Sequence, residues 1–136
     1  MRRSASTEGY QVGVVSEVRA RHVMEGEPGP EGRPHAHHYR IEVVAGAAEL
    51  DERGMVCDID VLTQGLSEVL DRIRGQDLGP FVPEASSVTV EALARWLHGQ
   101  LASVVAREGG QDLLVRVWEH PQAFGAYRGD PRDGAG

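Results

Sequence analysis

The stretch that decides the fold is residues 35–45, His-Ala-His-His-Tyr-Arg-Ile-Glu-Val-Val-Ala. Its odd-numbered positions, which would share one face of a strand, are His35, His37, Tyr39, Ile41 and Val43. Successive side chains of a β-strand point to opposite faces, so this alternation predicts a strand with one buried face. The buried face therefore begins with two histidines.

The residues before this stretch predict a partner strand from Tyr10 to Met24. Its even-numbered face carries mainly apolar residues and ends in a histidine: Tyr10, Val12, Val14, Val18, Ala20 and His22. Residues 25–34 between the two strands are rich in proline and glycine, which favour a loop. The two strands are therefore expected to pair as a hairpin.

The residues after this stretch predict two helices. One runs from Val61 to Ile73 after a cap at Asp58 or Asp60, and its apolar side chains recur at helical spacing. The other ends near Arg107 and begins after Thr89, a residue that favours the N-cap position.

Two further strands are expected at residues 112–120 and 124–128. The order strand, strand, helix, helix, strand, strand predicts an α+β fold, in which two helices pack on one face of a four-stranded antiparallel sheet. A single domain is expected over residues 10–129, between disordered tails at 1–9 and 130–136.

The composition limits the classes of partner and the compartment. The 136 residues carry a net charge of -7, which argues against nucleic acid as a partner. No apolar run is long enough for a membrane helix, and none follows Arg2 and Arg3 as a secretory signal would require. The single cysteine, Cys57, suits a reducing cytoplasm. The chain has no lysine, so no lysine can act as a Schiff base or amine nucleophile.

Three histidines are expected to converge if the two first strands pair. His35 and His37 share a face, and His22 ends the apolar face of the neighbouring strand. Three imidazoles suit zinc and leave a fourth position for water or substrate. From spacing alone, ordinary surface histidines explain the pattern equally well. His38 faces the other way, and His98 on the second helix is expected at the solvent surface.

Five short segments resemble the motifs of one enzyme family, in the same order along the chain. They are Ala20-Arg21-His22, His35-Ala36-His37-His38-Tyr39, Gly54-Met55-Val56-Cys57-Asp58-Ile59, Thr89-Val90-Glu91, and Glu119 followed by Tyr127-Arg128-Gly129. Together they resemble the 6-pyruvoyl-tetrahydropterin synthase / 6-carboxytetrahydropterin synthase family.

This resemblance implies the T-fold, in which subunits join their sheets into a barrel, usually as a hexamer of two stacked trimers. It implies one zinc ion per subunit, held by His22, His35 and His37, and a substrate such as 7,8-dihydroneopterin triphosphate. Glu119 would anchor the pterin ring, because a carboxylate accepts two parallel hydrogen bonds from the ring N–H and NH2 groups. Thr89 and Glu91 would line the same site, cap the second helix, or do both.

The chain departs from the family at its proton-transfer residues. Glu31 stands four residues before His35, where the family has a cysteine, and Arg74 and Gly75 stand where an Asp-His pair is expected. A variant branch of the family carries glutamate in place of the cysteine, so Glu31 is the candidate general base. A solvated loop residue is the competing interpretation of Glu31.

Three functions remain open on this evidence. The first is a zinc enzyme with altered lyase or cyclase chemistry on a pterin or pterin-like substrate, for instance in natural-product biosynthesis. The second is a homologue that binds zinc and ligand without turnover. The third is an ordinary pterin synthase that uses Glu31 as its base.

Overall fold

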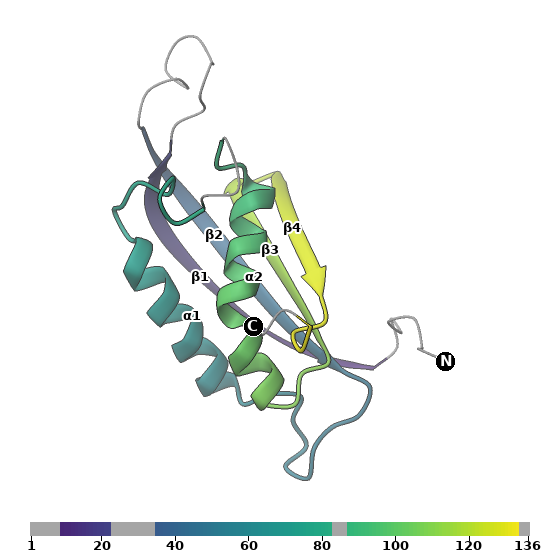
Figure 1. The fold of residues 1–136 in the computed structure, drawn as a ribbon. Coiled ribbons are helices and arrows are strands. Elements are labelled where there is room, and N and C mark those ends of the chain that lie inside the picture. Colours follow the sequence, from purple (N-terminus) through teal and green to yellow (C-terminus); the bar gives the residue numbers. More distant parts are fainter. Residues whose placement is uncertain (1–8, 23–34, 83–86, 134–136) are drawn as a thin grey trace.

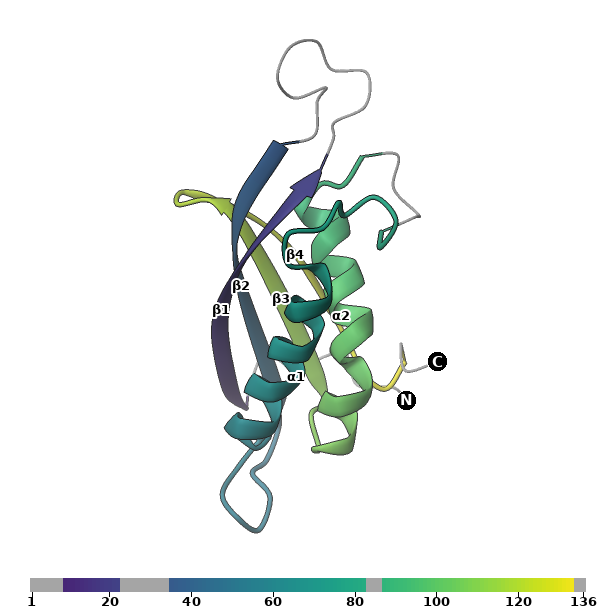
Figure 2. The same ribbon diagram turned by 90° about the vertical axis from the view of Figure 1, so that its left-hand side faces the viewer.

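The computed structural model describes residues 9–22, 35–82 and 87–133. These residues form a four-stranded antiparallel sheet in the order β1-β2-β3-β4, with both helices on one face (Figures 1 and 2). The elements are β1 (Tyr10–His22), β2 (His35–Ala47), α1 (Ile59–Ile73), α2 (Val90–Arg107), β3 (Asp112–His120) and β4 (Ala123–Gly129). The predicted α+β architecture and the T-fold element order are confirmed.

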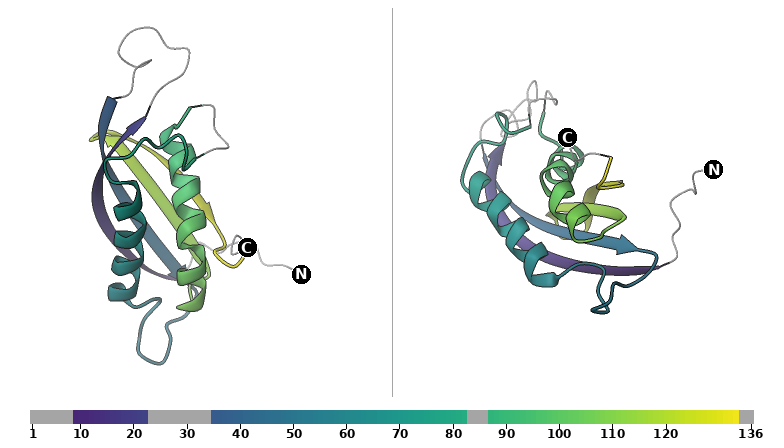
Figure 3. Two further views of the ribbon diagram at one scale, coloured as in Figure 1. Left: turned by 60° about the vertical axis from the view of Figure 1, so that its left-hand side comes forward. Right: turned by 60° about the horizontal axis from the view of Figure 1, so that its bottom comes forward.

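The two helices lie side by side across the sheet (Figure 3). Each begins at an N-cap side chain: Asp58 accepts a hydrogen bond from the Asp60 backbone N–H at 2.8 Å, and Thr89 accepts one from the Ala92 N–H at 3.1 Å. The capping by Asp58 makes α1 two residues longer than predicted at its start. No helix in the described ranges is both long and apolar enough to cross a bilayer.

The register between β1 and β2 brings the predicted histidine positions together. Ala20 pairs with His37, and His22 pairs with His35. On the same sheet face, towards the helices, lie fully buried core side chains, among them Val18, Ala20, Ile41 and Val43. The candidate ligands therefore continue the core face at one end of the sheet, where β1 ends and β2 begins (Figure 1).

A short segment after α1 covers the edge of β1 beside this end of the sheet. The Gly75 N–H donates to the Arg19 carbonyl at 2.7 Å, and the Leu78 N–H donates to the Arg21 carbonyl at 2.8 Å. The Arg21 N–H in turn donates to the Gln76 carbonyl at 2.8 Å. Residues 75–78 are thus held next to His22.

His98 is buried, and its predicted position at the solvent surface is wrong. Only 4% of the residue is exposed, and its Nε2 lies 3.2 Å from the Gly129 carbonyl oxygen. Its ring meets the Tyr127 ring edge-on at 4.7 Å. The reason is that α2 packs on β3 and β4, and His98 lies on the side of the helix that contacts β4.

This burial predicts a pH-dependent contribution to stability. Burial is the main cause that lowers the pKa of His98 below its ordinary 6.5. Between the two values the unfolded chain binds more protons than the folded chain, so the contribution is present above pH 6.5 and is lost as the pH falls below it. Denaturant unfolding at pH 7.5 and pH 5, with a chelator present, should show a smaller acid-dependent loss for His98→Gln than for wild type. Equal losses in both proteins would contradict the assignment.

Candidate metal and substrate-binding site

Two of the three predicted ligands lie face to face at the end of the sheet. The His22 and His37 rings stack with centroids 4.2 Å apart and planes within 7° of parallel. His22 is buried, while the His37 side chain is 23% exposed. The backbone of His35 pairs with that of His22, but the side chain of His35 lies outside the described residues.

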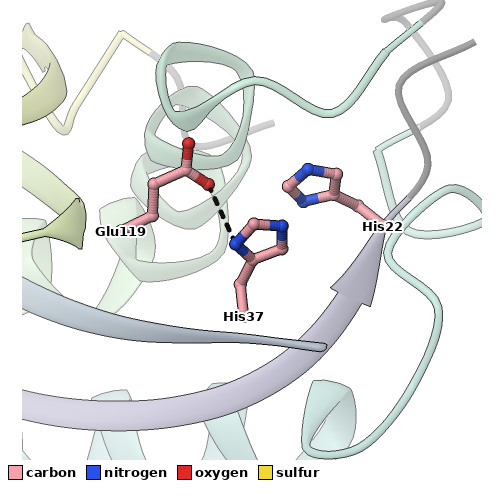
Figure 4. A group of neighbouring side chains, drawn as sticks. All are labelled: His22, His37 and Glu119. Atoms are coloured by element: carbon pink, nitrogen blue, oxygen red, sulfur yellow. Dashed lines mark ion pairs between the residues drawn. The ribbon is translucent and has the colours of Figure 1, made fainter. Parts of the chain in front are cut away.

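Glu119, at the end of β3, reaches this pair (Figure 4). Its carboxylate oxygen lies 3.6 Å from Nδ1 of His37, and its side chain is 40% exposed. One ligand atom from each of His22, His37 and Glu119 lies within 4.8 Å of the others. Imidazole nitrogens and carboxylate oxygens are both zinc ligands, so this group of donor atoms fits a zinc ion.

Tyr39 is the buried residue that lies next to both imidazoles. It is 1% exposed, and its ring centroid lies 6.3 Å from that of His22 and 5.8 Å from that of His37. Its hydroxyl is 2.6 Å from Nδ1 of His22. Burial, and secondly the negative charge of Glu119, holds the pKa of this hydroxyl well above its ordinary value, so it stays protonated. The sequence indicates that Tyr39 lies beside the histidines, because Tyr39 follows His35 and His37 on the same face of the predicted strand.

Thr89 and Glu91 lie near this end of the sheet but outside the histidine cluster. The Thr89 hydroxyl is used in capping α2. The Glu91 carboxylate lies over β4, where a Cβ added at Gly125 would be 3.0 Å from Oε1 of Glu91. Gly125 pairs with Val117, two residues before Glu119. The close approach of α2 to β4 thus places the Glu91 carboxylate beside β4, the strand that neighbours β3.

The candidate base and the segment that stands in place of the family's Asp-His pair are placed only in part. Glu31 lies outside the described residues. Arg74 pairs with Asp71 at 3.2 Å, and the Asp77 carboxylate accepts a hydrogen bond from the Gly79 N–H at 2.9 Å. Asp77 therefore holds a turn, in the segment that borders β1.

Comparisons with solved structures agree with the fold described above. The chain superposes on 6-pyruvoyl tetrahydropterin synthase of Caenorhabditis elegans with a TM-score of 0.68 and 23% identity, covering 89% of this chain and 96% of that one. For the Plasmodium falciparum enzyme the values are 0.69 and 12%, covering 91% and 99%. A Plasmodium vivax enzyme in which a catalytic glutamate is replaced by alanine gives 0.66 and 11%, covering 89% and 99%.

The family relationship follows from the sequence itself. No curated protein matches the chain. However, the sequence pattern of the family described as 6-pyruvoyl tetrahydropterin synthase matches residues 11–130, which is most of the chain. This protein belongs to the 6-pyruvoyl tetrahydropterin synthase family.

Proposed function

We propose that this protein is a zinc-dependent enzyme that acts on a pterin or pterin-like substrate by lyase or cyclase chemistry, with a proton-transfer step altered from the family's usual one. The observation that carries the proposal is the cluster of His22, His37 and Glu119 at the end of the sheet. His22, His35 and His37 hold the zinc ion, and Glu119 anchors the ring.

In this proposal the histidines bind the metal and Glu119 binds the substrate ring. Zinc, when bound, polarises the substrate's side-chain hydroxyls and makes them more acidic. Glu119 is exposed enough to meet a ligand, and as a carboxylate it accepts two parallel hydrogen bonds from the ring. The buried ring of Tyr39 lies against the histidines and keeps water away from Nδ1 of His22.

Glu31 is the proposed general base. The Plasmodium vivax relative has a catalytic glutamate, which supports a glutamate in this role. Glu31 precedes His35, the first proposed ligand of β2, by four residues in the sequence. The segment at Arg74 and Gly75 supplies no Asp-His pair, and this is the reason to propose an altered reaction that relies on the glutamate.

A homologue that binds ligand without turnover is the second candidate. It is favoured by the same loss of the Asp-His pair, because a binding protein needs the zinc ligands and Glu119 but no proton shuttle.

For either function we propose a cytoplasmic homo-oligomer whose subunits join through the edge strands β1 and β4. Both are edge strands with large exposed apolar side chains, Tyr10 and Val15 on β1 and Phe124 on β4.

The test is incubation of the zinc-loaded protein with 7,8-dihydroneopterin triphosphate, with products identified by mass spectrometry. A 6-carboxy, 6-pyruvoyl or 6-hydroxymethyl pterin is expected, and its identity distinguishes the altered reaction from the ordinary one. Glu31→Ala should lower the rate by about 10²- to 10⁴-fold, the usual worth of a general base.

Glu27→Ala, in the same loop, is the matched control and should keep the wild-type rate. Equal rates for Glu31→Ala and Glu27→Ala would remove Glu31 from the mechanism. Bound zinc and bound pterin without product would favour the non-catalytic homologue.

A further inference from the structure

The contact between Tyr39 and His22 joins two buried polar groups across β1 and β2. The residue directly opposite Tyr39 on β1 is Val18, so the tyrosine side chain extends along the sheet face to reach His22. The hydroxyl lies 2.6 Å from Nδ1, a short hydrogen bond. Both residues are nearly inaccessible to solvent, with 1% and 4% exposure, so water does not replace this contact.

The position of this hydrogen bond decides which ring nitrogen faces a metal. A histidine that binds zinc through one nitrogen carries its proton on the other, and the hydrogen bond at that second nitrogen fixes the ring's orientation and tautomer. In His22 the second nitrogen is Nδ1, because Tyr39 occupies that side. The ligand atom of His22 is then Nε2.

We infer that Tyr39 is a positioning residue of the metal site, which accepts a hydrogen bond from Nδ1–H of His22 and so presents Nε2 to the zinc ion. This inference rests on the proposed zinc site. When the Nδ1 proton is donated to the hydroxyl oxygen, the neutral imidazole that zinc requires has its lone pair on Nε2. The tyrosine ring itself contributes packing, which phenylalanine would preserve.

Tyr39→Phe therefore separates the hydrogen bond from the packing. The variant should bind zinc about 10- to 100-fold more weakly than wild type, the usual effect of losing a group that orients a ligand. The affinity is measured by competition with a chromophoric chelator. The visible spectrum of the Co²⁺-substituted protein should also change, because the ring of His22 is released from one orientation.

Tyr127→Phe is the matched control, since it removes a tyrosine hydroxyl from β4, where the ring packs against His98 and Arg95. Its zinc affinity and cobalt spectrum should equal those of wild type. Circular dichroism of both variants checks that the fold is retained. A second measurement needs no variant: ¹⁵N-detected NMR of the zinc-loaded wild type should show His22 protonated at Nδ1 and metal-bound at Nε2.

The outcomes separate the inference from the proposed function. Stoichiometric zinc in wild type with unchanged affinity and spectrum in Tyr39→Phe, or a His22 protonated at Nε2, would overturn the role of Tyr39 and leave the zinc site standing. Absence of zinc from correctly folded wild type would overturn both.

Discussion

Replacing His22 or His35 with alanine should remove most of the bound zinc. Each change deletes one of three proposed protein ligands, and two imidazoles without the third hold zinc far more weakly. His22→Ala also leaves the buried hydroxyl of Tyr39 without its imidazole partner, so it should lower stability as well as metal content. Metal content is measured by inductively coupled plasma mass spectrometry after dialysis, and folding by circular dichroism.

His38→Ala is the control for these variants. His38 is the neighbour of His37 in the sequence, but it lies on the opposite face of β2, where it is exposed and pairs with Glu17 at 3.3 Å. It should keep the wild-type zinc content. Stoichiometric zinc in His35→Ala would exclude His35 as a ligand and would point to Glu119 as the third one, since its carboxylate lies within reach of both other histidines.

Glu119→Gln should weaken pterin binding by about 1.5–3 kcal/mol, the worth of a hydrogen bond to a charged group, or roughly 10- to 150-fold in Kd. The amide keeps the shape of the side chain but supplies one acceptor where the carboxylate supplies two. Titration calorimetry with neopterin on the zinc-loaded protein measures the change. Glu17→Gln, an exposed carboxylate on the helix-free face of β1, should bind as wild type does.

The zinc content of Glu119→Gln decides between two roles for this carboxylate. Unchanged zinc with weakened neopterin binding fits a ring anchor. Lost zinc would make Glu119 a metal ligand, which the 3.6 Å separation from His37 also allows. Unchanged zinc and unchanged neopterin binding would leave it with neither role.

The sheet and its histidine end could be predicted from the sequence because they depend on local periodicity. The alternation along residues 35–45 fixes which side chains share a face, and the expected hairpin of the first two strands brings His22 and His35 to the same end of the sheet. The structure adds the register, in which these two residues pair. Contacts made by helix crossing could not be predicted. The sequence predicts His98 at the solvent surface, whereas its burial depends on where α2 lies over β4, which no local pattern encodes.

The residues of the candidate site also differ in how far they could be predicted. Glu119 was expected near the histidines because the family resemblance placed it there. The hydrogen bond of Tyr39 was not expected, because it connects positions that are not opposite each other in the β1–β2 register. The capping by Thr89 could be predicted from its residue type, whereas the position of Glu91 depends on the close approach of β4 to α2 at Gly125.

The pairing of Ala20 with His37 has a consequence for folding energetics. His22 and His37 belong to the neighbouring paired strands β1 and β2, so an ion bound to both acts as a cross-link between these strands. An ion that binds the folded chain and not the unfolded one raises the unfolding free energy by about 2.7 kcal/mol when its free concentration is 100 times its Kd. The melting temperature should therefore rise with free zinc, and a chelator should lower it by removing the cross-link between β1 and β2.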